Sequence, residues 1–327
     1  MEIRERSVVG AGGVRLAVFE RNVGAAETLV LIHGYPDNHR VWDPVADLLA
    51  ERFHVVTYDV RGAGASEVPE PVSAYRLELL AEDFRAVVEA VAPGSGKGGS
   101  AGGAGAGGGS NGGVGGVHVA AHDWGSIQGW HFVCDPQTAP LIATFTSISG
   151  PNLDAVAQFM RRSGATSPSL GQVVGQGAKS WYVGVFQIPK FAPAYWRSKL
   201  ARSTWPRMLA AVEKVPAELL PSGGDLDQAQ RDGANGVKLY RANMVGAMRA
   251  PRQVSTDVPV QVVVPLRDRY VSPALAQSVA GLGDDIVFHQ IDGGHWVLLT
   301  DPGRIAGLIS EHIDRQAAIA GLGWTLD

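Results

Sequence analysis

The stretch that decides the fold is Val117-His118-Val119-Ala120-Ala121-His122-Asp123-Trp124-Gly125-Ser126. Residues 117–121 form a mostly apolar run, which is typical of a strand buried on both faces. The run ends in small residues, and apolar positions at helical spacing follow from Ile127 to Phe132. A strand that turns sharply into a helix, with small residues at 121 and 125 around an acid at 123, has the shape of a nucleophile elbow.

Asp123 stands at the tip of this predicted turn, where Ser is the usual nucleophile. A carboxylate in this position attacks an electrophilic carbon and forms an alkyl ester on the enzyme. The residue type therefore indicates epoxide opening or halide displacement instead of acyl transfer. The alternative interpretation is a strand–loop–helix crossover in which Asp123 only caps the helix, since Asp is a common N-cap residue.

Length and composition restrict the class of protein. The 327 residues are 45% hydrophobic, which is enough for one large core or for a core with a smaller domain. The formal net charge of −4 gives no electrostatic reason to expect nucleic acid or an anionic membrane as a partner. Cys134 is the single cysteine, which excludes an internal disulfide and fits a reducing compartment.

The sequence shows no targeting segment and no membrane span. The N-terminus is charged and leads into no apolar signal region, and no apolar run reaches membrane-spanning length. We therefore expect a soluble cytoplasmic protein. We also expect no cofactor and no metal. The sequence leaves a homodimer open.

Strand patterns alternate with helical patterns along most of the chain. A predicted hairpin of residues 3–9 and 14–20 comes first. The predicted strands that follow are Thr28–Ile32, Val55–Tyr58, Val117–Ala121, Ala143–Ile148, Val260–Val264 and Ile286–Ile291. This alternation predicts an α/β fold with a mostly parallel central sheet and helices on both faces. In such a sheet the ligand lies beyond the carboxyl ends of the strands.

Two segments differ from this pattern. Residues 150–253 carry scattered Trp and Met residues in helical patterns, which indicates a helical cap inserted between residues 1–149 and 254–327 of the core. Gly94–Gly116 contains 14 glycines among its 23 residues, so it cannot bury enough surface to offset its ordering entropy. We expect a flexible loop there.

The glycine-rich segment also contains three misleading motif matches. Gly98–Gly102 and Gly108–Gly112 fit the serine-hydrolase pattern G-x-S-x-G, and Gly94–Gly99 fits the dinucleotide pattern G-x-G-x-x-G. None of them follows a predicted strand, so they lack the structural context that gives these patterns their meaning. We assign them no function.

An acid and a histidine follow the last two predicted strands. Asp268 comes after the strand at 260–264, and His295 comes after the strand at 286–291. Asp268 or His295 alone is explained by an ordinary turn. Together with Asp123, however, both follow strand ends that converge at one edge of the predicted sheet. We expect His295 to take a proton from water and Asp268 to orient the ring of His295.

The loop His33–Pro36 is the predicted second half of an oxyanion hole. Hydrolysis of an aspartyl ester places negative charge on a carboxyl oxygen of Asp123, and the backbone N–H groups of Tyr35 and Trp124 are placed to stabilise that charge. The structural alternative is a strand exit stiffened by Pro36. Both interpretations can hold together.

These residues resemble the epoxide hydrolases of the α/β-hydrolase fold, over nearly the whole chain except the glycine-rich segment. His33–Pro36 is similar to the family's H-G-x-P loop, in which the bond before proline is often cis. Arg61–Ser66 is similar to its R-G-x-G-x-S turn, and His122–Ser126 to its aspartate elbow. The resemblance implies an apolar epoxide as substrate and water as the second reactant.

The resemblance also implies roles for two tyrosines of the predicted cap. Epoxide hydrolases place two cap tyrosines over the aspartate, where they donate hydrogen bonds to the epoxide oxygen. Ser180–Gln187 is similar to the segment that carries the first tyrosine, here Tyr182. Leu239–Asn243 is similar to the segment that carries the second, here Tyr240, although Lys238 stands where that motif has asparagine.

Within this family, the motifs most resemble the hydrolase domain of bacterial two-domain proteins in which a short-chain dehydrogenase domain follows the hydrolase domain. Because the chain ends at Asp327, we expect no such second half here. Three tryptophans of the predicted cap, Trp181, Trp196 and Trp205, suggest an apolar substrate tunnel.

Two other functions stay open. A haloalkane dehalogenase shares the elbow, the acid and the histidine, and it holds the halide with the tryptophan after the nucleophile, here Trp124. Tyr35, however, occupies a position where Asn is common in such enzymes, and the cap tyrosines favour an epoxide because an alkoxide needs a proton donor. The third interpretation is a ligand sensor on a retired hydrolase fold, against which the intact catalytic positions argue.

Overall fold

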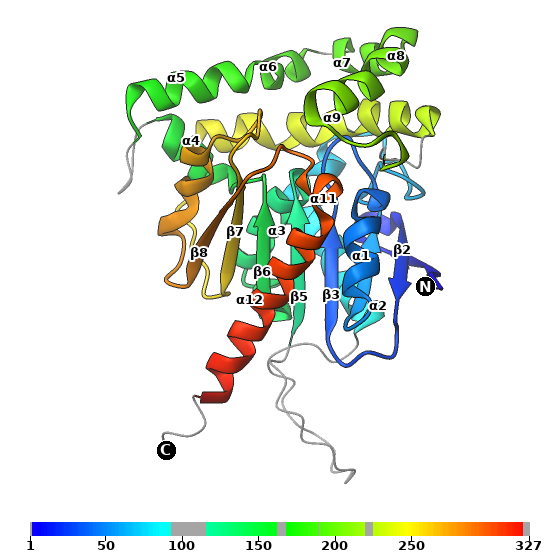
Figure 1. Ribbon diagram of the computed structural model, residues 1–327. Helices are drawn as coiled ribbons and strands as arrows, with labels where there is room; N and C mark the ends of the chain where they lie inside the picture. Colours follow the sequence, from blue (N-terminus) through cyan, green and yellow to red (C-terminus); the bar gives the residue numbers. More distant parts are fainter. Residues whose placement is uncertain (1, 93–115, 162–167, 189, 220–224, 323–327) are drawn as a thin grey trace.

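The computed structural model describes residues 2–92, 116–161, 168–188, 190–219 and 225–322. Its centre is an eight-stranded sheet with the order β1-β2-β4-β3-β5-β6-β7-β8 (Figure 1). The pairs β1–β2 and β2–β4 are antiparallel, and the other neighbouring pairs are parallel. The strands are β1 (Arg4–Val9), β2 (Arg15–Arg21), β3 (Thr28–Ile32), β4 (His54–Tyr58), β5 (Val117–His122), β6 (Ile142–Ile148), β7 (Val260–Pro265) and β8 (Ile286–Ile291). The predicted α/β fold with a mostly parallel sheet is confirmed.

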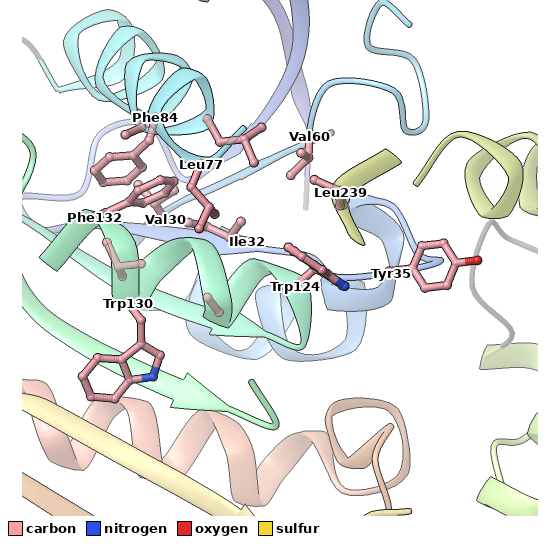
Figure 2. Packing of buried hydrophobic residues seen from close by; sticks show 14 of the residues in the cluster. Val30, Ile32, Tyr35, Val60, Leu77, Phe84, Trp124, Trp130, Phe132 and Leu239 are labelled. Atoms are coloured by element: carbon pink, nitrogen blue, oxygen red, sulfur yellow. The ribbon is translucent and has the colours of Figure 1, made fainter. Parts of the chain in front are cut away.

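Helices cover both faces of the sheet, which explains why its central strands are apolar throughout. On β3, Leu29 points to one face and Val30 to the other, because successive side chains alternate along a strand. Figure 2 shows the face of Val30, where the rings of Phe84 and Phe132 stack 4.8 Å apart. The helices on the Leu29 face are α1 (Asp43–Leu49), α11 (Val297–Thr300) and α12 (Pro302–Leu322), and those on the Val30 face include α2 (Leu77–Val91) and α3 (Trp124–Cys134).

Between β6 and β7 the described part of the chain is helical and contains no strand. These helices lie over the end of the sheet at which the parallel strands finish, with α5 to α8 on the outer side of α9 (Figure 1). They are α4 (Leu153–Met160), α5 (Leu170–Lys179), α6 (Trp181–Gln187), α7 (Phe191–Trp196), α8 (Lys199–Met208) and α9 (Leu226–Arg249). We refer to this helical segment as the cap, while its predicted limits at 150 and 253 stay a prediction.

Residues 93–115, which make up nearly all of the segment predicted to be a flexible loop, lie outside the described residues. The elements that flank this segment are α2 before it and β5 after it, and the end of α2 and the start of β5 both lie at the end of the sheet opposite the cap (Figure 1). The remaining helix of the core, α10 (Pro273–Ala276), contacts β7. Within the described ranges, no helix combines the length and the apolar character that crossing a membrane requires.

Candidate active site

Asp123 lies at the turn from β5 to α3, with a φ of 52° and a ψ of −121°. A non-glycine residue in such a conformation is strained by roughly 1–3 kcal/mol and needs the surrounding structure to hold it. The turn tolerates only small neighbours. A Cβ atom on Gly125 would lie 2.3 Å from the carbonyl oxygen of Ile32, and one on Gly34 would lie 2.5 Å from the side chain of Asp123. The backbone therefore has the geometry of a nucleophile elbow.

The structure brings Asp123, Asp268 and His295 together. His295 Nε2 is 3.5 Å from Asp123 Oδ2, and His295 Nδ1 is 2.9 Å from Asp268 Oδ2. The other oxygen of Asp268 accepts hydrogen bonds from the backbone N–H groups of Tyr270, at 2.7 Å, and Val271, at 3.0 Å. The loop after β7 thus fixes the acid, and the acid fixes the histidine ring.

The charges of this group shift its pKa values in opposite directions. Burial alone would lower the pKa of His295, but the carboxylates of Asp268 and Asp123 outweigh burial and raise this pKa well above its usual value. Burial alone would raise the pKa of Asp268, but attraction to His295 and the backbone hydrogen bonds hold it below its usual value. While both carboxylates are ionised, the ring of His295 is therefore held in its protonated form.

Two buried side chains outside the predicted set hold the backbone of His295. His122 Nε2 donates to the carbonyl oxygen of His295 at 2.9 Å, and Glu213 Oε2 accepts from the backbone N–H of His295 at 3.2 Å. Burial, followed by the charge of His295, lowers the pKa of His122 to about 4, so this ring stays neutral. Glu213 belongs to a short π-helix of the cap, Leu209–Glu213, which links the cap to the loop of His295.

The backbone N–H of Tyr35, one of the two groups predicted to form an oxyanion hole, contacts Asp123, while its role in the reaction stays a prediction. The backbone N–H of Tyr35 donates to Asp123 Oδ1 at 2.7 Å, and the bond between Tyr35 and Pro36 is cis. The side chain of Tyr35 anchors the cap, because its hydroxyl donates to the carbonyl oxygen of Gly233 at 3.1 Å. Trp124 is the first residue of α3, and the role of its backbone N–H stays a prediction.

Tyr182 on α6 and Tyr240 on α9 lie side by side in the cap, with ring centroids 6.1 Å apart. Both line the same cavity as Asp123. Burial, followed by nearby charges and phenols, raises the pKa of each tyrosine far above its usual value. Each phenol therefore keeps its proton and can act as a hydrogen-bond donor.

The cavity has a volume of about 930 Å³ and a mainly aromatic wall. It includes all three tryptophans that predicted an apolar tunnel. The charged side chains of the wall are those of Asp123, Lys179 and Arg269. The aromatic side chains of the wall are Tyr35, Trp181, Tyr182, Phe186, Phe191, Tyr195, Trp196, Trp205, Tyr240, Tyr270 and Trp296. Such a wall suits an apolar ligand.

Sequence reasoning missed further residues at this site. Tyr270 packs edge-on against His295, with ring centroids 4.7 Å apart, and its position two residues after Asp268 was the available signal. Asp37 is buried and accepts a hydrogen bond from Trp296 Nε1 at 2.9 Å, and burial raises its pKa to about 7. No motif identified Asp37, because its partner is far away in the sequence.

Among the residues that the structure describes, no group of three or more His, Cys, Asp or Glu side chains is arranged to hold a metal ion.

Comparison with known proteins places the chain in a family. Residues 29–308 match the sequence profile of the alpha/beta hydrolase family. The chain belongs to the alpha/beta hydrolase family. This hydrolase is 33% identical over 317 residues to the protein named "Probable oxidoreductase EphD" of Mycobacterium tuberculosis, an alignment that covers 94% of the hydrolase and 49% of EphD. The hydrolase thus spans about half the length of this relative.

Proteins named as epoxide hydrolases are also similar to this hydrolase. "Epoxide hydrolase A" of Mycobacterium tuberculosis is 27% identical over 211 residues, which is 63% of this chain and 54% of that protein. The crystal structure of a Bacillus megaterium epoxide hydrolase in complex with an inhibitor superposes with a TM-score of 0.70 and 18% identity, covering 95% of this chain and 100% of that one. At this identity the structural match supports the fold alone.

Proposed function

We propose that this alpha/beta hydrolase opens an epoxide to a vicinal diol through an ester on Asp123. One observation carries the proposal: the elbow residue Asp123 lines an apolar cavity together with the phenols of Tyr182 and Tyr240, and the pair of His295 and Asp268 lies directly beside it. The similarity to proteins named as epoxide hydrolases supports it. The substrate is expected to be apolar, because the wall of the cavity is mainly aromatic.

In the first step, a carboxylate oxygen of Asp123 attacks an epoxide carbon and the bond from that carbon to the epoxide oxygen breaks. The hydroxyls of Tyr182 and Tyr240 donate to the leaving oxygen, and one of them gives it a proton. The ester that forms no longer carries the charge of Asp123. Because this charge helps to raise the pKa of His295, its loss lowers that pKa, and the ring gives its proton to solvent and becomes a neutral base. The ring takes up a proton from solvent again when the charge of Asp123 returns.

In the second step, water attacks the carboxyl carbon of the ester and gives a proton to His295. The backbone N–H of Tyr35, already bonded to Asp123 Oδ1, stabilises the negative oxygen of the intermediate. The ester bond then breaks, and the second diol oxygen takes the proton from His295. Ionisation of the Asp123 carboxylic acid returns the proton that was used in the first step, so the overall reaction consumes one water.

Halide displacement remains the competing function, because the same three residues serve it. The ring of Trp124 is buried and packs edge-on against Tyr240, with centroids 4.7 Å apart. Two phenols over Asp123 supply a proton, which an alkoxide needs and a halide does not. This difference favours the epoxide.

The decisive experiment traps the ester. His295→Gln should form the ester and then stop, so the Asp123 peptide gains the mass of one substrate on incubation with a styrene-oxide-like epoxide. A single turnover of the unaltered enzyme in ¹⁸O-water should give mostly unlabelled diol and place the label in Asp123.

The matched control is Asp123→Asn, which should gain no mass. Labelled diol, an unlabelled Asp123 and no trapped adduct would show direct attack by water and remove Asp123 as the nucleophile. Turnover of short haloalkanes without turnover of epoxides would favour the dehalogenase.

A further inference from the structure

Helix α5 presents its apolar side to solvent. Leu170 and Val174 are 62% and 63% exposed, and the spacing of four residues places them on one face of the helix. Ala178 and Trp181, which follow at spacings of four and three, are also exposed, with Trp181 at 69%. This stripe runs from α5 to the first residue of α6.

The polar side of α5 faces the core of the protein. Gln176 Nε2 donates to the carbonyl oxygen of Tyr270 at 2.7 Å, and Gln176 Oε1 accepts from the N–H of Ser272 at 3.0 Å. Lys179 Nζ donates to the carbonyl oxygen of Asp268 at 2.6 Å. A surface helix normally buries its apolar stripe and exposes its polar one. Helix α5 has the opposite orientation, with its apolar side exposed, and this orientation indicates an apolar partner outside the protein.

Helices α7 and α8 and the end of α6 carry more exposed apolar residues. Ile188, Phe191 and Leu200 are 50%, 58% and 60% exposed. Helices α5 to α8, with which these residues are associated, form the layer farthest from the sheet (Figure 1). We define the outer cap face by its exposed apolar residues Leu170, Val174, Trp181, Ile188, Phe191 and Leu200. Exposed apolar side chains gathered in this way mark a site of interaction.

The outer cap face is also basic. Residues 168–214 contain seven Lys and Arg residues and one acidic residue, Glu213, although the whole chain has a net charge of −4. Two of the seven are engaged, because Lys179 donates inward to the carbonyl oxygen of Asp268 and Arg202 pairs with the exposed Asp227 of α9. Glu213 is buried against the loop of His295 and contributes no surface charge that opposes the basic side chains. Four exposed basic residues of this segment are Lys190, Arg197, Lys199 and Arg207. The expectation of no anionic membrane partner relied on the charge averaged over the chain, which conceals this local excess.

The active-site cavity opens on this face. Trp181, Phe191 and Tyr195 line the cavity and are exposed as well, so the cavity reaches the surface at their side chains. We propose that the outer cap face docks on the surface of an anionic lipid bilayer. Apolar and aromatic side chains then enter the headgroup boundary while Lys and Arg contact the anionic headgroups. A second part rests on the proposed function: the apolar epoxide enters the cavity directly from the lipid.

Charge and geometry favour a bilayer over other occupants. A second copy of the chain would bring one basic face against another, and like charges oppose such a pairing. A protein partner seated on the face would cover the mouth of the cavity, whereas a bilayer is itself a reservoir of apolar substrate. Binding of this kind needs no membrane-spanning helix.

The test measures co-sedimentation of the full chain with vesicles of phosphatidylglycerol and, separately, of phosphatidylcholine, in the absence of substrate. The protein should pellet with the anionic vesicles and much less with the zwitterionic ones, and high salt should weaken the binding. Leu170→Ser with Val174→Ser, and separately Lys199→Glu with Arg207→Glu, should each weaken binding on the order of tenfold or more. Neither pair belongs to the wall of the cavity.

Matched controls change equally exposed residues elsewhere. Val9→Ser with Ile319→Ser removes two exposed apolar side chains, and Arg40→Glu with Arg304→Glu reverses two exposed charges. Both control variants should bind as the unaltered protein does. Circular dichroism confirms that each variant is folded.

Three results would overturn the proposal. The first is an unaltered protein that stays in the supernatant with anionic vesicles, and the second is unchanged binding by both cap variants. The third is a dimer in sedimentation equilibrium that Leu170→Ser with Val174→Ser converts to a monomer, which would make the face an interface between copies. Because no step uses substrate, these results are independent of whether the enzyme opens epoxides.

Discussion

At the scale of single residues, the pair of His295 and Asp268 gives a prediction about pH. The charge of Asp268 is the largest influence that raises the pKa of His295. Asp268→Asn should lower this pKa, so the rise of ester hydrolysis with pH should move to lower pH. The misoriented ring should also slow hydrolysis by about 10⁴, as the loss of such an acid does in other triads. Rapid quenching followed by mass analysis of the Asp123 peptide measures both effects.

The control for this variant is Asp292→Asn, which changes an exposed acid of the loop that precedes His295. This control variant should show the same pH dependence of ester hydrolysis as the unaltered enzyme. An unchanged profile in Asp268→Asn would mean that Asp268 is not the group that sets the pKa of His295.

The two cap tyrosines give the second prediction. In the proposed mechanism, the phenols of Tyr182 and Tyr240 share the developing charge of the epoxide oxygen, and removal of one oxyanion-type donor costs on the order of 10²–10³ in rate. Tyr182→Phe and Tyr240→Phe should each slow ester formation by that factor, and the double variant should nearly abolish it. Single-turnover kinetics of ester formation measure the effect.

Tyr58→Phe is the matched control, because the hydroxyl of Tyr58 is buried in the core without a hydrogen-bond partner in the described part of the chain. It should keep the rate of the unaltered enzyme. If both single cap variants opened epoxides at the rate of the unaltered enzyme, haloalkane dehalogenation would become the favoured function.

At the scale of elements, helix α9 is held on the core by a buried carboxylate. Asp232 accepts from Asn38 Nδ2 at 3.0 Å and from the backbone N–H of Gly64 at 2.9 Å, and both partners lie in loops of the core. Asp232→Ala leaves these donors without the carboxylate. A hydrogen bond to a charged group contributes about 1.5–3 kcal/mol, so the free energy of unfolding should fall by about that amount. Urea denaturation measures this loss.

Asp227→Ala on the same helix is the control. Asp227 is exposed and pairs with Arg202, and exposed ion pairs contribute about 0–1 kcal/mol. Equal stability of the two variants would show that Asp232 does not hold α9 on the core.

The same carboxylate makes the docking of α9 sensitive to pH. Burial raises the pKa of Asp232 from 3.8 to about 7, so between these two values the folded protein binds more protons than the unfolded chain does. The contribution of Asp232 to the free energy of unfolding is therefore largest at low pH and declines as the pH rises towards 7. Asp37, with a pKa raised to about 7, acts in the same direction.

At the scale of the whole molecule, the described residues that flank the glycine-rich segment, the end of α2 and the start of β5, lie at the end of the sheet opposite the candidate active site (Figure 1). Val117, where β5 begins, is six residues before Asp123, which corresponds to about 20 Å along a strand. Replacing residues 94–115 by a short turn should therefore leave kcat and KM for the epoxide almost unchanged. Loss of turnover in a variant with an unaltered circular dichroism spectrum would contradict this separation.

The sequence by itself determined the architecture and the order of the chemical groups. Strands that alternate with helices predict a parallel sheet, and the groups that follow its strands must then meet at one edge. For this reason Asp123, Asp268 and His295 could be proposed together without coordinates. Asp123 could also be proposed as the nucleophile from the sequence, because a sharp turn between a strand and a helix has a local signature around this residue.

Only the tertiary structure decided which side chains support these groups and which way the cap helices face. His122 and Glu213 both contact the backbone of His295, although His122 is 173 positions and Glu213 is 82 positions away from it in the sequence. No local pattern specifies such pairs. The sequence shows the apolar periodicity of α5, but this periodicity is the same whether the apolar stripe is buried or exposed. Its direction was decided by the bonds from Gln176 and Lys179 to the core loops, because these bonds hold the polar side of the helix inward.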